Sequence, residues 1–454
     1  MQIQEIRLTN FKCFKSVKIQ CSKFTLLTGA NSSGKSSVLH GLLGAVQTKD
    51  FPLYFSPNGT YVSMGDFEEL AYHHSRRITF GVGLSLMSEK AGLSNFDCTY
   101  GRNPKTGLPK LRTLDYSSPA FSLRARARRG AYAAEFVYEP NKKPGFSPPL
   151  QDVMKRMSLG FLEVEEKRAH ESVKKAKDRT VAKKMIQMMY SSRKREGSFR
   201  FKDSAQLFGL PGKRSFLFPP LMEMNSLLRT LDERLDFISS FRLSPERTYY
   251  QKTKAALKVD KYGDNAIDQI VEWEQAKAEE HSRLKQALVT LHLATELRSK
   301  KYAGGRYDIR VVPSDSNLPS SLCDVGFGVS QFLPILVADL QMGKGSTLVV
   351  SQPEIHLHPS VQAALANYFC KQSDKFEKRY ILETHSEYLI SRFRLLVAKG
   401  ELKEDDVSAY YFSPRAGRPV CHRLRFRKNG RIEGAPEDFF STYMMDAMDI
   451  AMNA

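Results

Sequence analysis

Residues 24–47 read FTLLTGANSSGKSSVLHGLLGAVQ, and this stretch decides the fold. Its first six residues form a short apolar run that ends in glycine, which is typical of a buried strand. After Gly34, apolar residues recur at helical spacing, at Val38, Leu39, Leu42, Leu43 and Val46. The stretch therefore predicts a strand, a tight loop and a helix in direct succession.

The loop between the predicted strand and helix fits the phosphate-binding pattern G-x-x-x-x-G-K-[ST] over Gly29–Ser36. Glycines let the backbone wrap around phosphates, and the amides that open the helix point at them. Lys35 would neutralise the outer phosphates, and Ser36 would offer its hydroxyl to Mg²⁺ as the metal ligand. The motif predicts ATP and Mg²⁺ as cofactors, with binding residues Asn31, Ser32, Ser33, Gly34, Lys35, Ser36 and Ser37.

Strands and helices alternate again in the last third of the chain. The strand-like segments are YDIRVV from Tyr307, STLVV from Ser346 and RYILE from Arg379, with helices expected from near Ser330 and Ser360. Two further strands, IQEIRL and SVKIQ, precede the phosphate-binding motif. We therefore expect an α/β fold with a mostly parallel, doubly wound sheet and an N-terminal antiparallel sheet.

The middle of the chain is predicted to interrupt this fold as a basic, mixed and helical insertion. Residues 87–149 are irregular, with short strand-like pieces and Pro and Gly punctuation. Residues 161–195 favour a short helical pair, and residues 266–300 favour a helix. The predicted division is 1–85 for the first part of the ATP-binding head, 86–300 for the insertion, 301–420 for the second part of the head and 421–454 for a C-terminal extension.

Charge is concentrated in the insertion. The whole chain has 454 residues and a formal net charge of +20, and residues 101–200 contain 24 Lys and Arg against 10 Asp and Glu. The segment either faces nucleic acid or is a solvated basic insertion, and its composition leaves both interpretations open. The six cysteines are scattered without a zinc-type spacing, which favours buried free thiols. With no apolar run of membrane-spanning length and no secretory signal, we expect a cytoplasmic location and no membrane partner.

Several motifs together resemble the bacterial AAA15-type ATPases. These are the opening IRLTNFKCFKSVKIQCSKFTLLTGANSSGKSS, then DVGFGVSQFLPIL, QPEIHLHP, ETHSEYLI and GRIEGAPEDFF. Such proteins have an ABC-type ATPase head related to structural-maintenance-of-chromosomes (SMC), RecF and OLD-family proteins. Several are similar to ATPase subunits of two-gene anti-phage systems such as Septu and PARIS, in which the ATPase associates with a separate nuclease.

The resemblance assigns roles outside the phosphate-binding loop. Residues 326–331, GFGVSQ, resemble the signature segment that caps nucleotide bound on the opposite subunit, with Gly328 and Ser330 as contacts. Two heads would then pair as an ATP-sandwich homodimer at minimum, or as part of a larger homo-oligomer. His385 occupies the position of the switch histidine near the γ-phosphate. By contrast, His356 and His358 lack a third ligand at metal-site spacing, which favours a structural turn.

In the ATPases that this chain resembles, two adjacent acids end this strand, the first for Mg²⁺ and the second for the attacking water. In this chain the same positions are Ser351 and Gln352. Ser351 adds no charge, and Gln352 can orient a water but cannot accept its proton at neutral pH. Glu354 is either a displaced general base or an interface or turn residue, and Glu383 is a second candidate for the base. The expected catalytic set is Glu354, His385 and Gln352, with slow hydrolysis. Arg242, Arg247 and Tyr249 form a basic loop that either faces nucleotide or a neighbour, or is solvated.

Two functions from different classes follow. The first is an oligomeric ATPase that scaffolds or regulates a separate effector, with a nuclease in anti-phage defence as the resemblance implies. The 69 residues after His385 contain no cluster of acids of the nuclease type, so the effector is expected on another chain. The alternative is a DNA-binding repair or chromosome-maintenance ATPase that uses the basic insertion. The sequence does not favour a metabolic kinase, because no pocket for an acceptor substrate can be recognised beside the phosphate-binding loop.

Overall fold

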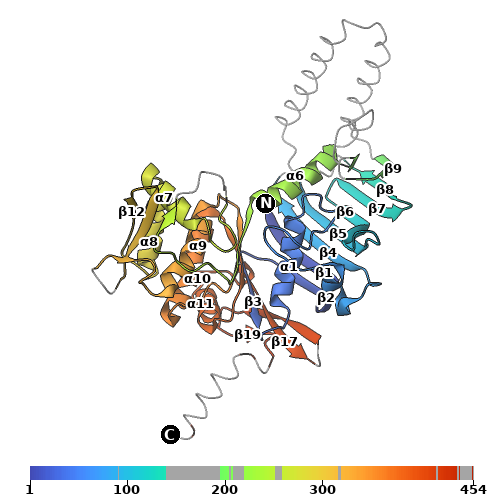
Figure 1. Ribbon diagram of the computed structural model, residues 1–454. Helices are drawn as coiled ribbons and strands as arrows, with labels where there is room; N and C mark the ends of the chain where they lie inside the picture. The colour runs from blue at the N-terminus through green and yellow to red at the C-terminus, as the bar shows by residue number, and fades with distance from the viewer. Residues whose placement is uncertain are drawn as a thin grey trace.

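The computed structural model describes residues 1–89, 91–139, 195–203, 206–207, 219–250, 258–314, 318–415, 418–436, 439 and 452. Figure 1 shows that the described elements form two lobes. The blue and cyan strands near the N-terminus form one lobe, and the yellow and orange helices form the other, with β3 where the two meet.

The largest sheet is antiparallel throughout and begins at the N-terminus. Its order is β2-β1-β4-β5-β6-β7-β8-β9, so later strands extend the sheet from the free edge of β1. Its strands are β1 Gln2–Phe11, β2 Phe14–Gln20, β4 Phe80–Ser88, β5 Gly92–Arg102, β6 Pro109–Ser117, β7 Phe121–Arg128, β8 Ala131–Tyr138 and β9 Arg195–Phe201.

Residues 87–139 differ from the irregular insertion that the sequence predicted. They form regular strands because Phe96, Cys98 and Tyr100, two residues apart, all point into the core and are at most 2% exposed. Strand β4 then joins this segment to β1. The helical pair predicted within residues 161–195 lies outside the described residues, apart from Arg195 at the start of β9.

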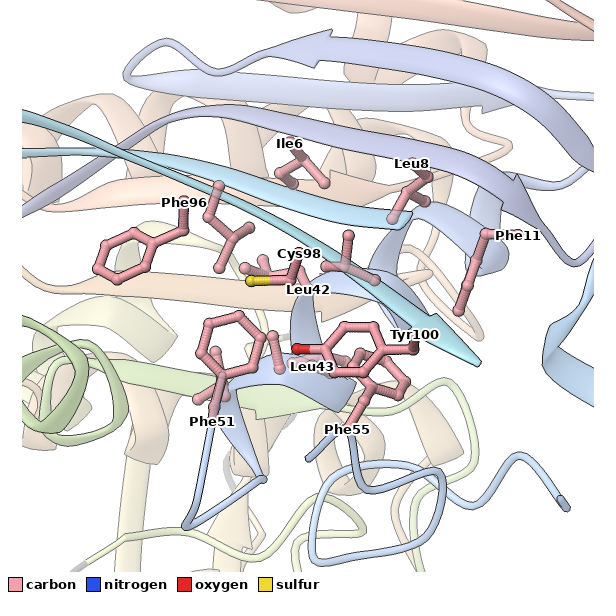
Figure 2. Close-up of a cluster of buried hydrophobic side chains, with 14 of the residues drawn as sticks. Ile6, Leu8, Phe11, Leu42, Leu43, Phe51, Phe55, Phe96, Cys98 and Tyr100 are labelled. Carbon is pink, nitrogen blue, oxygen red and sulfur yellow. The ribbon is translucent and has the colours of Figure 1, made fainter. Parts of the chain in front are cut away.

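The buried face of this sheet packs on helix α1, Lys35–Val46. Figure 2 shows Ile6, Leu8 and Phe11 of β1 above Leu42 and Leu43 of α1, with aromatic rings from β5 and the loop after α1 filling the remaining space. The sheet thereby fixes the helix that follows the phosphate-binding loop, and with it the loop itself.

The second sheet is the parallel one that the sequence predicted. Its order is β10-β15-β16-β3-β17-β18-β19, and the pairs from β10 to β17 are parallel. Its strands are β10 Leu235–Ile238, β15 Thr347–Ser351, β16 Arg379–Glu383, β3 Phe24–Gly29, β17 Val407–Arg415, β18 Arg418–Phe426 and β19 Ile432–Glu433. The predicted α/β class, with a parallel sheet beside an N-terminal antiparallel sheet, is confirmed.

Both faces of the parallel sheet are buried, as its apolar strands require. Leu27, Val349 and Ile381 point to the side of α1 and α6, whereas Leu26, Val350 and Leu382 point to the opposite core. Helices α7 to α11 cover that opposite core. The helices are α2 Phe67–Leu70, α6 Pro219–Glu233, α7 Ala266–Ala276, α8 Glu279–Thr290, α9 Phe327–Gln341, α10 Pro359–Phe376 and α11 Glu387–Ala398.

A small third sheet explains two further differences from the sequence prediction. It contains β11 Tyr249–Tyr250, β12 Glu296–Tyr302, β13 Arg306–Val312 and β14 Ser320–Ser321. The segment YDIRVV therefore pairs with β12 and not with the parallel sheet. The helix expected over residues 266–300 is instead two helices that break at Lys277, which has a left-handed φ of 51°, followed by strand β12.

The predicted division into 1–85, 86–300, 301–420 and 421–454 remains a prediction. Two elements of the middle segment, α6 and β10, pack within the cores just described, and β18 crosses the boundary at residue 420. In the described part of the chain, we find no helix with both the length and the apolar character needed to span a bilayer.

Candidate nucleotide site

The phosphate-binding loop has backbone geometry that demands glycine at two positions. Gly29 has φ 129°, and a Cβ there would lie 2.1 Å from the carbonyl oxygen of Phe412. Gly34 has φ 98° at the start of α1, and a Cβ there would meet the ring of Phe14 at 2.6 Å. The tight turn between β3 and α1 is therefore available only to this glycine pattern.

Lys35 and Ser33 hold the loop from inside. The Lys35 Nζ donates to the carbonyl oxygens of Gly29 at 3.1 Å and Ala30 at 2.7 Å, and the Ser33 hydroxyl donates to Ala30 at 2.7 Å. Burial lowers the pKa of Lys35, while Glu383 and Glu354 act in the opposite sense. A partly desolvated ammonium at the start of a helix attracts an anionic group strongly.

The remaining predicted loop residues lie around this centre. Asn31, Ser32 and Ser36 are exposed, whereas Ser37 is half-buried beside the thiol of Cys13, whose Sγ lies 3.6 Å from its hydroxyl. The exposed members line the outer surface of the turn, where a phosphate chain can reach them.

Glu383 connects the phosphate-binding loop to β15, the strand that has Ser351 and Gln352 in place of two acids. The Ser36 hydroxyl donates to Glu383 Oε1 at 2.6 Å, and the Ser351 hydroxyl donates to Glu383 Oε2 at 3.0 Å. Glu383 is 5% exposed and pairs directly with Ser351 across the parallel ladder of β15 and β16. The sequence suggested Glu383 only as a second candidate for the base, because the register of two strands cannot be read from either strand alone.

The side chain of Arg242, from the loop after β10, reaches the C-terminal end of β15, and its guanidinium is buried there. Its guanidinium donates to the carbonyl oxygens of Ser351 and Gln352, both at 2.9 Å, and to that of Gln331 at 3.4 Å. Burial lowers the pKa of Arg242 to about 10, and Glu354 opposes this. Arg242 is thus a bracing residue of the strand end, while Arg247 forms an exposed ion pair with Asp324 at 2.8 Å.

Glu354 joins the strand end to the predicted switch. Its Oε1 accepts the backbone N–H of His385 at 2.7 Å, whereas its Oε2 is buried with no hydrogen-bond partner in the described residues. Burial raises the pKa of Glu354, and burial followed by the nearby Lys35 lowers the pKa of His385. The backbone of Gln352 has φ 49° and donates to the Glu383 carbonyl at 2.6 Å.

The signature-like segment forms the first turn of α9. Gly328 packs so closely that a Cβ there would lie 2.8 Å from the His356 carbonyl oxygen, and the Ser330 hydroxyl donates to Phe327 at 3.0 Å. His358 accepts from the backbone of Ser360 and caps α10, a structural role. Ser330, predicted to contact nucleotide, is only 6% exposed, and among the described residues no hydrogen bond joins Gly328 or Ser330 to the phosphate-binding loop.

A match to the family AAA_15, described as an AAA ATPase domain, covers residues 1–99 and 159–390. This chain belongs to the AAA_15 family of ATPase domains. The matched ranges contain both the phosphate-binding loop and the strand ends of β15 and β16. The AAA_15 assignment establishes a nucleotide-binding ATPase, and the hard oxygen donors of Ser36 and Glu383 suit a magnesium-bound nucleotide.

One curated relative is the OLD nuclease of Thermus scotoductus, which is 29% identical over 126 residues. The match covers 27% of this chain and 24% of that protein, so the chain spans about a quarter of the length of this relative.

Solved structures of SMC heads are also similar. An SMC head bound to the C-terminal winged-helix domain of ScpA shares 11% identity, with 94% of this chain and 99% of that one covered and a TM-score of 0.43. The head from Thermotoga maritima shares 9% identity, with 93% and 98% covered and a TM-score of 0.35.

Proposed function

We propose that this AAA_15 ATPase binds Mg–ATP firmly, hydrolyses it slowly, and uses nucleotide-dependent pairing of heads to control a separate effector. The observation that supports slow hydrolysis is the end of β15, where Ser351 and Gln352 replace the two acids. Glu354, the next carboxylate, has one oxygen committed to the backbone of His385. The loss of a general base typically costs about 10²–10⁴-fold in rate.

Mg²⁺ held at the Ser36 hydroxyl would neutralise part of the phosphate charge. Within the chain, Lys35 would meet the outer phosphates, Ser36 would present its hydroxyl, and Gln352 would orient a water without accepting its proton. ATP then acts mainly as a ligand that favours one head arrangement over another.

The surface around the signature-like segment supports pairing with a second copy. Phe327 is 57% exposed in the first turn of α9, and Gln331, one turn further on the same face, donates to the Leu243 carbonyl at 3.1 Å. Leu243 and the neighbouring Phe241 are 52% and 81% exposed. Exposed large apolar side chains grouped at one place are typical of an interaction surface.

The effector is proposed to be a nuclease in anti-phage defence. The matched segment of the OLD nuclease supports a link between this type of ATPase and nucleic-acid cleavage. The defence role rests on the resemblance of the quoted motifs to two-gene anti-phage systems.

Turnover and bound nucleotide should be measured together on the wild type and on Lys35→Ala, Gln352→Glu and Glu354→Gln. We expect wild type to retain ATP with very slow turnover, Lys35→Ala to lose ATP, and Gln352→Glu to hydrolyse faster by roughly 10-fold or more. Brisk wild-type turnover of several per second that Glu354→Gln abolishes would contradict the proposal and identify Glu354 as a working base.

A second candidate function, binding of duplex nucleic acid, is favoured by the outer face of the antiparallel sheet. Arg126 and Arg200 flank the small side chain of Ala133 in one cross-strand row, and Arg128 pairs with Ala131 in the next. All three arginines are exposed, and no ion pair to them is found among the described residues. Arg124, one row away, is paired with Asp115 at 2.7 Å.

Such a cluster fits the phosphate backbone of a duplex, for which affinity falls steeply with salt. Binding of a fluorescent DNA duplex should therefore be titrated at several salt concentrations for wild type and for the triple variant Arg126→Ala/Arg128→Ala/Arg200→Ala. We expect the slope of log K against log salt to decrease by roughly 2–3 in the triple variant. Arg124→Ala is the matched control, and salt-insensitive binding in wild type would exclude this function.

A further inference from the structure

We propose that Glu383 supplies, from the neighbouring strand, the carboxylate that the magnesium site needs and that Ser351 lacks. This inference rests on the proposed binding of Mg–ATP. It is supported by register, because Ser351 of β15 and Glu383 of β16 are direct partners across the parallel ladder. A carboxylate at 383 therefore reaches the space that an acid at 351 would fill.

The hydroxyl of Ser36 is oriented by this contact. A serine hydroxyl has one proton and two lone pairs, and the Ser36 proton is committed to Glu383 Oε1 at 2.6 Å. Its lone pairs are then directed away from Glu383 and are free for a cation. An outer carboxylate that accepts a hydrogen bond from a metal ligand raises the basicity of that ligand and fixes its orientation.

Ser351 completes the arrangement from the other side. Its hydroxyl donates to Glu383 Oε2 at 3.0 Å, so both carboxylate oxygens accept hydrogen bonds and the side chain, 5% exposed, has one defined position. An acid at residue 351 would instead place two carboxylates in contact, and like charges this close cannot both ionise easily. Serine at 351 and glutamate at 383 are thus complementary, and this pair of neighbouring strand ends carries one acid.

Glu354 does not fit this role. Its Oε1 is held by the His385 backbone, and no hydrogen bond connects it to the phosphate-binding loop in the described part of the chain. Glu383 is the carboxylate that contacts the loop. The two acids therefore have separate positions, with Glu383 beside the metal ligand and Glu354 beside the switch.

The test is the affinity of a fluorescent ATP analogue, measured in EDTA and across a MgCl₂ titration. In wild type, Mg²⁺ should tighten binding with a defined midpoint. We expect Glu383→Gln to raise this midpoint by roughly 10–100-fold, the usual effect of removing an outer carboxylate, with binding in EDTA unchanged. Glu387→Gln, four residues later and exposed in the first turn of α11, is the control.

A second substitution makes the result specific. If the site requires one acid at either position, Ser351→Asp should restore the Mg²⁺ midpoint in the Glu383→Gln background. An unchanged midpoint in a folded Glu383→Gln protein overturns the inference, and a lower turnover with an unchanged midpoint would make Glu383 a base instead.

Two further outcomes are distinguishable. If Glu383→Gln does not fold, Glu383→Asp serves in its place, because the shorter side chain keeps the charge but withdraws it from Ser36; its midpoint must then rise. If wild type binds no nucleotide in either condition, the proposed function fails. If wild type binds and only the Mg²⁺ dependence is insensitive to Glu383, the inference fails alone.

Discussion

At the scale of single residues, the phosphate-binding loop is held both by contacts within the loop and by one contact with a distant strand. The glycines and Lys35 of the phosphate-binding loop could be predicted from sequence because their roles depend on one strand, one turn and one helix. The contact between Ser36 and Glu383 joins residues 347 positions apart. It depends on the order of β3, β16 and β15 in the sheet, which no local pattern specifies.

Asp236 in β10 gives a prediction about pH. Burial raises its pKa from 3.8 to about 7, and its Oδ1 accepts the N–H of Phe237 at 2.8 Å. The unfolded chain releases this proton near pH 3.8, whereas the folded chain keeps it until about pH 7. Folding stability from this group is therefore complete below pH 3.8 and is lost as the pH rises through 7.

Replacing Asp236 by Asn keeps the acceptor and removes the titration. We compare the unfolding free energy of Asp236→Asn with that of wild type at two pH values. The difference, variant minus wild type, should be about 2 kcal/mol larger at about pH 8.5 than at about pH 5.5. Urea unfolding at both pH values checks this, with Asp374→Asn on the exposed surface of α10 as control. A gain that is equal at the two pH values would show that Asp236 does not titrate between them.

At the scale of elements, a buried polar cluster joins α9 to β16. Asp339 of α9, 0% exposed, accepts from Tyr368 at 2.7 Å, Tyr380 at 2.8 Å and Lys378 at 3.3 Å. The signature-like segment begins α9, and Glu383 ends β16. The cluster therefore fixes the relative position of the two elements that present opposite parts of the nucleotide machinery.

The cluster predicts that the effects of substitutions at Lys378 and Asp339 on the unfolding free energy are strongly non-additive. Lys378→Met should destabilise the protein by about 3–5 kcal/mol, because it leaves the Asp339 charge buried without its cation. Adding Asp339→Asn, which still bonds both tyrosines, should recover most of that loss. Chemical denaturation of the two single variants and the double variant measures the coupling. A cost below about 1 kcal/mol for Lys378→Met would contradict a stabilising ion pair between Lys378 and Asp339.

The prediction of helices and strands from the sequence failed where pairing between strands outweighed the local preference of the residues for another structure. Residues 296–302, ELRSKKY, look helical or solvated by composition, yet seven register pairs with β13 make them a strand. Residues 87–149 contain short strand-like pieces, but their Gly and Pro punctuation suggested an irregular insertion. The parallel sheet was predictable because its strands are apolar on both faces.

At the scale of the whole molecule, the exposed apolar surface around the signature-like segment predicts nucleotide-dependent association. Phe241→Glu should place a charge in the interface of two paired heads and weaken association by at least about 10-fold, while each chain still binds ATP. Sedimentation with and without a slowly hydrolysed ATP analogue checks this. Met222→Glu, 63% exposed on α6, is the control, and equal loss in both variants would contradict this location of the interface.

The central place of β3 has a consequence for synthesis on the ribosome. Strand β3 lies between β16 and β17, so the Gly29 turn closes against Phe412 only after that residue has been made. At about 5–20 residues per second, the nascent chain carries its nucleotide motif without its supporting strands for roughly 20–80 seconds. The N-terminal antiparallel sheet and α1 can assemble during that interval, whereas ATP can stabilise the protein only after Phe412 has been synthesised.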